Sequence, residues 1–582
     1  MSKPVKQTKR KDTTTKASAK SAGWFERYGW LLLIVVPFLL YAVTLTYKIT
    51  QLDDYIFIFD KDPFNNKFSN ITRIFSIGVF SEKDIYYRPL FLASFLIERL
   101  FVDLQNAASS LAVYHFTNIA LHVACVLAVH RFLKIVGVEA KVALLLALLY
   151  AVHPALTMAV AWIPGRNDSM LTLFALGFFV KLHAYIRDDN KTHLFWQFLF
   201  FMAALFTKET ALFIPAVATI YLWSMKIKPI GKRSLFVHAT WIPVVVIWWV
   251  LRNNVLDEAQ DARTIGERIA DAVHRLPAYL VYVGKVFFPF NLNVFPSLDN
   301  ETIWFGVAAV AVIGALFYFT LRNDSDKEDR GFRTRKMLLG LAWFVIFIFP
   351  FLLVPPKIND QVFEHRLYLP MIGLLIFLGH TFLFNGSLKF NRVATASALV
   401  GVLFVVLTVR YLPLFNSPIK FWENAVAASP NSSYAHKLLG ARYNEANMKD
   451  KALPQFKIAY ALNKDEKHAR YFIARDELEP AGKNDEAMKL LYEEIKINPT
   501  YTEAYFELSH LYFMRNQTDS TLKYLLLSRD HQPVDPMINN NLLLTFINRR
   551  DYDGAKKQVA YMKQNGLTVD PNAERQAEAL KQ

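Results

Sequence analysis

The chain has 582 residues, of which 53% are hydrophobic and 15% aromatic, and it carries a formal net charge of +16. The apolar residues are concentrated in repeated runs that end near residue 412, and the sequence beyond them is polar with helical patterning. This distribution argues against a wholly soluble protein and predicts a membrane domain followed by a soluble domain.

The basic residues follow a pattern typical of membrane topology. They are dense in the tail 1–28 and in short loops between apolar runs, at 131–141, 226–233 and 330–336. Clusters in alternate loops are what the positive-inside rule produces, so we expect a cytoplasmic tail and no nucleic-acid partner. The first apolar run lacks the small-residue site of a cleavable signal and should remain as an anchor. The single cysteine, Cys125, lies inside an apolar run, so we predict no intramolecular disulfide and no cysteine metal cluster.

We interpret eleven apolar runs as membrane crossings. They are 30–49, 112–133, 142–160, 169–186, 194–206, 210–225, 235–251, 302–321, 337–355, 367–385 and 393–411. With the tail inside, the loops that face outside are 50–111, 161–168, 207–210, 251–301 and 356–366, and the basic loops face inside. The short segment 276–290 contains Lys285 and Pro289, so we interpret it as re-entrant or interfacial. This topology places the C-terminal domain outside.

From about residue 417 small residues recur with a period of 34–35. The positions are Ala435, Ala469, Ala504 and Asn539 in the first helix of each unit, and Ala452, Ala487, Thr521 and Ala555 in the second. This period is that of a tetratricopeptide repeat, whose paired helices stack into a solenoid. The repeats would bind a polypeptide on a concave face, or would only brace the membrane domain. The expected fold is therefore all-α: a polytopic transmembrane domain over 29–412, and a repeat solenoid over 417–582.

An acidic pair, Asp53 and Asp54, lies about one helical turn beyond the first crossing. A carboxylate at a membrane surface can take a proton from a hydroxyl acceptor, while a cation later in the loop, such as Arg88, holds a phosphate leaving group. The alternative is that the aspartates only cap the loop and orient the crossing, and that Arg88 is a snorkelling interfacial arginine. No glycine-rich phosphate loop or dinucleotide fingerprint is present, so a nucleotide-sugar donor is not expected.

Other polar residues lie within the apolar runs. His115, Asn118 and His122 share one face of a crossing, where they would line a working cavity or form interhelical hydrogen bonds only. They lack a clear third ligand, so we predict no zinc site. His153 and Pro154 are expected to bend their crossing and open its backbone toward the cavity.

Taken together, the short motifs resemble one family. The acidic pair and Tyr87-Arg88-Pro89-Leu90 are similar to the first luminal loop of the transmembrane and tetratricopeptide-repeat-containing O-mannosyltransferases. Further motifs in the matching order are Tyr114-His115-Phe116-Thr117-Asn118 with Leu121-His122, His153-Pro154, Gly165-Arg166, Lys208-Glu209 and Glu364-His365-Arg366. With the repeats, the resemblance covers nearly the whole chain after the tail. Two features depart from the pattern. Only about four repeats are present, which suggests a bacterial relative, and Asn293 stands where an acidic residue is expected.

This family belongs to the GT-C superfamily of inverting glycosyltransferases, and the resemblance implies its chemistry. The implied donor is a dolichyl- or undecaprenyl-phosphate hexose, with mannose favoured, and the implied acceptor is a Ser or Thr hydroxyl. Asp53 would be the base, with Asp54 orienting it, raising its pKa or holding a divalent cation. The residues expected on the donor phosphate are Arg88, Arg366 and Lys208. The remaining candidates for the substrate cavity are His115, Asn118, His122, His153, Arg166, Asp168, Glu209 and Glu364.

Two rival functions stay open on the sequence. The enzyme could act on a lipid or oligosaccharide acceptor, with the repeats docking an assembly partner. Alternatively, the chain could be a non-catalytic membrane scaffold whose repeats recruit export proteins. We expect a multi-pass protein of a bacterial inner membrane, or of the endoplasmic reticulum if the source is eukaryotic, with the repeats in the periplasm or lumen. Membrane lipid and an acceptor polypeptide are the other expected partners.

Overall fold

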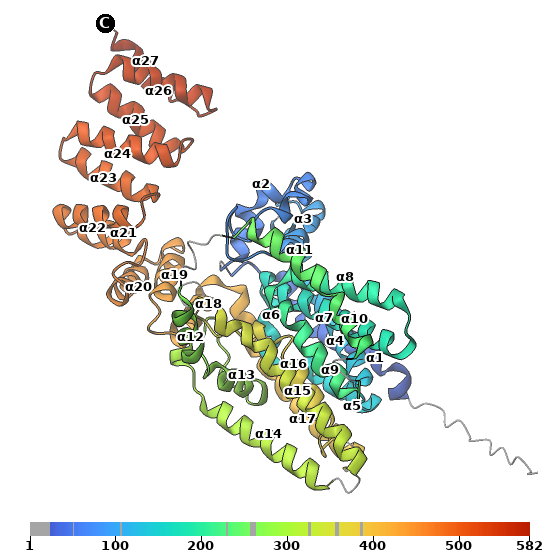
Figure 1. Ribbon diagram of the computed structural model, residues 1–582. Helices are drawn as coiled ribbons and strands as arrows, with labels where there is room; N and C mark the ends of the chain where they lie inside the picture. The colour runs from blue at the N-terminus through green and yellow to red at the C-terminus, as the bar shows by residue number, and fades with distance from the viewer. Residues whose placement is uncertain are drawn as a thin grey trace, which may run out of the picture.

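The computed structural model describes residues 24–581, apart from 51, 105–106, 228–230, 257–262, 324–326, 356–359 and 385–387. Residues 1–23 of the predicted basic tail lie outside the described residues. Within the described ranges the secondary structure is helical and no β-strand is present, which confirms the all-α prediction. Figure 1 shows a helical bundle from which a curved array of helix pairs, α19 to α27, extends at one end.

The bundle contains helices of very different lengths. The helices are α1 (Trp24–Tyr41), α4 (Ala107–Ile135), α5 (Ala140–Ala151), α6 (Thr157–Ala161), α7 (Arg166–Asp188), α8 (Lys191–Thr207), α9 (Ile214–Ser224), α10 (Lys232–Ala239), α11 (Ile242–Asn253), α12 (Ile265–His274), α13 (Ala278–Phe287), α14 (Trp304–Asn323), α15 (Lys327–Leu353), α16 (Met371–Gly379) and α17 (Phe390–Tyr411). Short 3₁₀ segments that matter below are η6 (Pro154–Leu156), η7 (Ile163–Gly165), η8 (Glu209–Phe213), η11 (Glu364–Leu367) and η12 (Leu412–Asn416).

Fewer helices qualify as crossings than the eleven predicted. Among the described residues, 7 are long and apolar enough, namely Arg27–Thr46, Leu111–Ile135, Ile163–Asp188, Ser234–Asn253, Trp304–Asn323, Glu328–Leu353 and Phe390–Asn416. The pair Ala140–Ala151 and Pro154–Ala161 would make an eighth, and it is bent by 56° at the expected His153-Pro154 break. These long apolar helices are those of a multi-pass membrane protein.

The excess in the prediction has a physical cause. The predicted crossing 367–385 contains α16, whose 9 residues rise about 14 Å, too little to cross a hydrocarbon core of about 30 Å. Nearly all of α16 is buried between α15, α4 and α5, so its apolar residues face protein on every side. The predicted crossings 194–206 and 210–225 likewise correspond to α8, with 17 residues, and α9, with 11.

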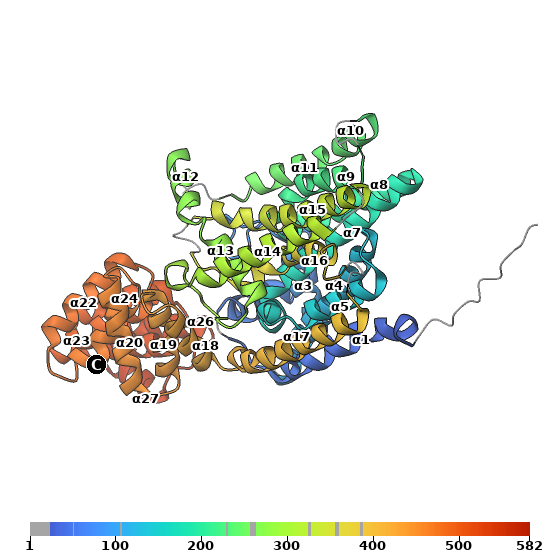
Figure 2. The ribbon, with the colours of Figure 1, turned by 90° about the horizontal axis from the view of Figure 1, so that it is seen from below.

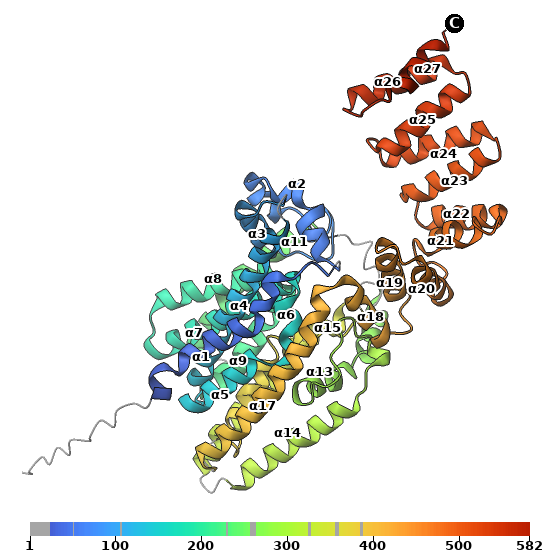
Figure 3. The same ribbon diagram turned by 180° about the vertical axis from the view of Figure 1, so that it is seen from behind.

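The segment 276–290 contains α13, whose 10 residues are too few to cross alone. It packs tightly on α14, because a Cβ built on Gly306 would lie 2.1 Å from the carbonyl oxygen of Leu280. Apart from this contact α14 is largely uncovered by protein along the edge of the bundle (Figures 1 and 3). Figure 2 shows α12, which precedes α13, at the margin of the bundle, where it contacts α15.

The predicted outer loop 50–111 folds into a small helical cap. Its elements are a π-helical turn at Ile56–Asp60, α2 (Asp62–Asn65), 3₁₀ turns at Phe68–Ile71, Arg73–Phe75 and Arg99–Phe101, and α3 (Pro89–Glu98). The cap has its own core, in which Phe57 packs on Phe91 and Phe95 with ring centroids 5.0 and 5.2 Å away. It lies at the end of the bundle from which the repeats extend (Figures 1 and 3).

The C-terminal helices pair as the 34–35-residue period predicts. They are α18 (Pro418–Ala428), α19 (Ser433–Glu445), α20 (Lys449–Leu462), α21 (Ala469–Ile473) with a π-helical turn at Ala474–Leu478, α22 (Asn484–Ile497), α23 (Thr502–Met514), α24 (Thr518–His531), α25 (Pro536–Asn548), α26 (Tyr552–Gln564) and α27 (Pro571–Ala579). All eight periodic small positions are buried. The solenoid joins the bundle without a linker, since η12 connects α17 to α18, and Trp422 belongs to the same buried core as the bundle.

Candidate active site

A cavity of about 1510 Å³ lies between the cap, the bundle and the first repeat. Six of the predicted site residues line it, namely Asp53, Arg88, Asp168, Lys208, Glu209 and Arg366. They come from the cap, α7, the α8–η8 junction and η11, which are far apart in the sequence. The cavity therefore brings a carboxylate at the start of the cap together with three cations.

Asp53 is half-buried, and within the described part of the chain its carboxylate takes part in no hydrogen bond or ion pair. Its neighbour Asp54 is buried, and both of its carboxylate oxygens accept hydrogen bonds. The Asp54 carboxylate accepts hydrogen bonds from the backbone N–H of Thr50 at 2.5 Å, the Thr50 hydroxyl at 3.0 Å and the backbone N–H of Leu52 at 3.1 Å. Asp54 thus fixes the turn that presents Asp53 to the cavity. The divalent cation at this pair remains a prediction.

The surroundings of Asp53 favour its neutral form. Burial, followed by the like charge of Asp54, raises the pKa of Asp53 to about 7, while the positive charge of Arg88 opposes the shift. A carboxyl group that titrates near neutral pH suits general-base catalysis, because it binds a proton and releases it again at the working pH.

Arg88 is held by Glu209 of η8. The Nε and Nη2 atoms of Arg88 each lie 2.9 Å from Glu209 Oε2, and the guanidinium lies 4.6 Å from the centre of the Tyr86 ring. A guanidinium has five N–H donors, so Arg88 keeps donors for a second anion in the cavity.

Lys208 follows α8 and reaches the first turn of α7. Its Nζ donates to Asp168 Oδ1 and Oδ2 at 2.7 and 2.8 Å and to Asn167 Oδ1 at 3.3 Å. Burial lowers the pKa of Lys208 to about 8, with Asp168 opposing the shift and Arg88 adding to it. Lys208 is therefore a buried cation that loses its charge as the pH rises through about 8.

Arg366 differs from the other two cations because no carboxylate among the described residues pairs with it. Its guanidinium lies 4.4 Å from the centre of the Phe351 ring, and its Nη1 donates to the carbonyl oxygen of Gln361 at 2.5 Å. A cation stacked on an aromatic face and short of anionic partners is a suitable site for a phosphate.

The other predicted site residues lie outside the lining of this cavity. Arg166 is fully buried and pairs with Glu98 of α3, while its Nε donates to Asn118 Oδ1 at 2.9 Å. Asn118 in turn donates to the carbonyl oxygens of Val160 and Trp162, both at 3.0 Å. This network holds the segment that carries Trp162, which lines the cavity.

The three predicted histidines are packed between helices. His122 bonds the Tyr368 hydroxyl at 2.6 Å and the carbonyl oxygen of Ala151 at 3.0 Å. His153 bonds the carbonyl oxygen of Val286 at 3.0 Å. His115 is buried, and neither of its ring nitrogens has a hydrogen-bond partner among the described residues.

Glu364 belongs to a buried charge cluster behind the cavity wall. Lys285 Nζ lies 2.6 Å from Glu364 Oε1 and 2.8 Å from Glu301 Oε1, and all three side chains are at most 3% exposed. Asn293, which departs from the family pattern, donates its backbone N–H to Glu364 at 3.1 Å and its side-chain amide to Glu301 at 3.3 Å. The amide of Asn293 thus contacts the acidic side chain of Glu301, and the cluster ties α13 to the segment that carries Arg366.

Sequence reasoning missed several residues of the site. Glu98 and Glu301 could have been found as acidic residues beside apolar runs, and Arg252 as a basic residue at the end of an apolar run. Arg252 lines the cavity and lies 5.5 Å from the centre of the Trp248 ring. Tyr434 also lines it, from the first repeat, and no local pattern marks that residue.

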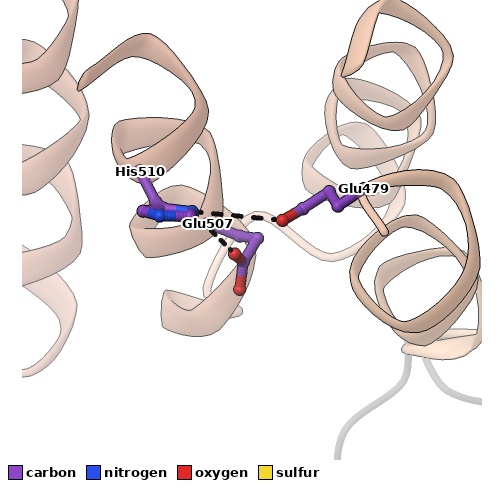
Figure 4. Close-up of side chains that lie close together, drawn as sticks. All are labelled: Glu479, Glu507 and His510. Atoms are coloured by element: carbon purple, nitrogen blue, oxygen red, sulfur yellow. Dashed lines mark ion pairs between the residues drawn. The ribbon is translucent and has the colours of Figure 1, made fainter. Parts of the chain in front are cut away.

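A second group of metal-ligating side chains lies in the repeats (Figure 4). Ligand atoms of Glu479, Glu507 and His510 all lie within 4.8 Å of one another, and His510 Nδ1 is 3.5 Å from Glu507. Burial, then the Glu507 charge, raises the pKa of Glu479 to about 8, and a hydrogen bond with Glu507 raises the pKa of His510. With Glu479 protonated near neutral pH, a protonated His510 balances the charge of Glu507, so we assign no metal here.

Comparison with known proteins gives a sequence match to a protein O-mannosyl-transferase of Caenorhabditis elegans, with 21% identity over 366 residues. The match covers 61% of this chain and 50% of the worm protein, so the chain spans about half the length of the curated relative it matches. No family model matches the chain.

Among solved structures, the MamA protein is similar at 18% identity, with a TM-score of 0.22 over 29% of this chain and 86% of that one. YrrB, described as a TPR protein with an unusual peptide-binding site, is similar at 16% identity, with a TM-score of 0.23 over 31% of this chain and 90% of that one. Both TM-scores are low, so the solenoid assignment depends on the helix pairs themselves. In sequence, the chain is similar to a protein O-mannosyltransferase, in agreement with the resemblance found in its motifs.

Proposed function

We propose that the chain is an inverting glycosyltransferase that moves mannose from a polyprenyl-phosphate donor to Ser or Thr hydroxyls of proteins on the extracytoplasmic face of a membrane. The observation that carries the proposal is the placement of Asp53. Its carboxylate, without a partner among the described residues, opens into the same cavity as Arg88, Lys208 and Arg366. The name of the worm relative agrees with this chemistry.

The transfer needs one base and one anion site. Asp53 takes the proton from the acceptor hydroxyl while the oxygen attacks the anomeric carbon. The bond between that carbon and the donor phosphate breaks on the opposite face, which inverts the configuration, and the lipid phosphate leaves with the electron pair. Arg88 and Arg366 hold the phosphate oxygens as they gain charge, and Lys208 adds positive charge nearby.

A lipid-linked donor is supported by an apolar part of the cavity wall. The lining includes Trp248 of α11 and Phe347, Ile348 and Phe351 of α15, and the Phe351 ring contacts the guanidinium of Arg366. A polyprenyl chain could lie against such a wall while its phosphate reaches Arg366.

Helix α12 supports the same arrangement. Its exposed apolar stripe is formed by Ile265, Ile269 and Val273, which are 77%, 60% and 60% exposed. The opposite side of α12 carries Glu267 and Asp271, and the cavity lining includes Arg263, just before the helix, and Arg268, within it. An amphipathic helix of this kind lies in a membrane interface. We infer that α12 rests in the outer leaflet and places the mouth of the cavity at the level of lipid phosphates.

The proposal is tested with purified protein and a radiolabelled polyprenyl-phosphate mannose. Transfer to a Ser/Thr peptide by the wild-type protein, and its loss in Asp53→Asn with donor binding retained, is the expected result. Donor binding without transfer to any peptide would favour a lipid or oligosaccharide acceptor, and absence of donor binding would refute the proposal.

A further inference from the structure

Five rings form a continuous row along the cavity, which we call the aromatic strip: Trp162, His365, Phe363, Phe295 and Tyr434. Successive ring centroids are 5.5, 5.2, 5.6 and 5.8 Å apart. The first ring belongs to the bundle beside η7, and the last belongs to α19 in the first repeat. The strip therefore crosses from the membrane domain into the solenoid.

The junction that carries the outer half of the strip is fixed by hydrogen bonds. The backbone N–H of Val294 donates to Asn424 Oδ1 at 3.0 Å, and that of Ser297 donates to Ser429 Oγ at 3.0 Å. Ser429 Oγ donates to the carbonyl oxygen of Phe295 at 2.7 Å. Since α18 is hydrogen-bonded to the loop after α13 and Tyr434 of α19 stacks on Phe295 of that loop, the first repeat forms part of the cavity wall.

The rings differ in exposure in a way that indicates a ligand. The four inner rings are 4–7% exposed, whereas Tyr434 is 42% exposed. One face of Tyr434 stacks on Phe295 at an interplanar angle of 24°, and Trp422 lies edge-on at 6.0 Å. A tyrosine that is rigidly supported yet open to a cavity offers large contact area at low entropic cost.

Charges of both signs lie around Tyr434, and Lys437 Nζ is 4.6 Å from the centre of its ring. Glu466 lines the cavity, is 8% exposed, and is held by Lys437 at 2.5 Å and by the Ser433 hydroxyl at 2.7 Å. Burial, followed by the negative charge of Asp53, raises the pKa of Tyr434 to about 12, which places the ring in the electrostatic field of Asp53. The cations on the phosphate side, Arg88 and Arg366, belong to other segments of the wall.

We propose that Tyr434, supported by the aromatic strip, forms an acceptor subsite that holds an extended polypeptide between the repeat array and Asp53. The inference rests on the proposed function and adds a substrate-contacting residue to it. A polypeptide fits better than a glycan because the strip leads directly into the helical repeats, whose stacked units suit an extended chain.

The test measures binding without donor, so that it does not depend on transfer. Full-length protein in detergent is titrated against a fluorescein-labelled peptide rich in Thr and Ser, and fluorescence anisotropy gives the Kd. We expect Tyr434→Ala to raise the Kd about tenfold, equivalent to ~1.4 kcal/mol, and Tyr434→Phe to stay within about twofold. Phe513→Ala is the matched control: Phe513 is a 49% exposed ring on α23, outside the cavity, and its removal should change the Kd less than about twofold.

Cross-linking provides a second test in case Tyr434→Ala does not fold. A photoreactive benzoylphenylalanine at position 434 should cross-link to the same peptide, and one at position 513 should not. The proposal is overturned if wild-type protein does not bind the peptide, if Tyr434→Ala binds it as tightly, or if a labelled mannan oligosaccharide cross-links to position 434 in its place. A protein that binds the peptide through Tyr434 but transfers no mannose would refute the proposed function and keep this subsite.

Discussion

Glu209 grips Arg88 with a single carboxylate oxygen: Glu209 Oε2 lies 2.9 Å from both Nε and Nη2 of the guanidinium. The other oxygen, Oε1, accepts the backbone N–H of Tyr87 at 3.1 Å. One side chain in η8 therefore fixes both the course of the cap before α3 and the direction of its arginine. This contact connects two motifs that are 121 positions apart in the sequence.

Arg88→Lys tests whether this geometry serves the donor. A lysine keeps the charge but cannot bind Glu209 and a phosphate through one planar group. We expect kcat/KM for the polyprenyl-phosphate donor to fall by about tenfold to a hundredfold, in keeping with the loss of one or two charge-assisted hydrogen bonds. Arg73→Lys is the control, since Arg73 forms an exposed pair with Glu82 in the same cap. Equal effects of the two substitutions would remove Arg88 from the phosphate site.

The buried pair of Arg166 and Glu98 should contribute to stability. Removing one partner leaves an uncompensated charge inside the protein, at a typical cost of about 3–5 kcal/mol. Glu98→Ala should therefore lower the thermal unfolding midpoint clearly, whereas Glu82→Ala, which breaks an exposed pair, should change it little. Intrinsic fluorescence during heating measures both. A Glu98→Ala midpoint equal to that of Glu82→Ala would show that the pair is not needed for folding.

The pH dependence of transfer follows from two shifted groups. Asp53, whose pKa is raised to about 7, is protonated below that pH and cannot accept a proton, so kcat/KM should rise as the pH rises through 7. Lys208, whose pKa is lowered to about 8, loses its charge above that pH, so the rate should fall again on the alkaline side.

Lys208→Arg separates the two limbs of this profile. An arginine stays charged throughout this pH range. The alkaline limb of the profile should therefore shift to higher pH, while the acid limb stays near pH 7. Initial rates of mannose transfer at acceptor concentrations well below KM give kcat/KM for both curves. A wild-type profile that is flat from about pH 6 to about pH 9 would contradict the assignment of Asp53 as base.

The position of α12 in the outer leaflet can be measured independently of activity. The single cysteine, Cys125, is fully buried, so a spin label on Ile269→Cys reports one site. In lipid nanodiscs we expect this label to be accessible to collisions with oxygen, which dissolves in the bilayer, and inaccessible to a water-soluble nickel complex. The label on Glu267→Cys, on the charged side of α12, should show the reverse. Similar exposure of both labels to the nickel complex would mean that α12 stands in water.

The sequence allowed the repeat solenoid to be predicted because its signal is periodic. Small residues such as Ala504 and Thr521 return every 34–35 positions and are buried where paired helices touch. The polar groups Asp53, Arg88 and Arg366 could also be selected, since charges beside apolar runs are costly without a use. These inferences depend on local sequence and were therefore accessible.

Other features depend on tertiary packing and could not be predicted. The run that forms α16 is as apolar as a crossing, and only its neighbours show that it is enclosed by protein. The imidazole of His122 could have faced a cavity, yet it is hydrogen-bonded to the Tyr368 hydroxyl and to the carbonyl oxygen of Ala151. Tyr434 enters the site because the solenoid docks on Phe295, a contact between residues 139 positions apart, which one sequence cannot reveal.

The most direct test of the proposed transfer chemistry compares wild type, Asp53→Asn and Asp60→Asn in mannose transfer from a radiolabelled polyprenyl-phosphate donor. Asparagine keeps the size of the side chain and one acceptor oxygen but cannot take the proton, and loss of a general base typically costs about 10²–10⁴-fold in rate. Asp60 is an exposed carboxylate in the same cap and serves as the control. We predict that Asp53→Asn loses transfer while still binding the donor, and that Asp60→Asn transfers like wild type. Transfer by Asp53→Asn at the wild-type rate would contradict the proposed mechanism.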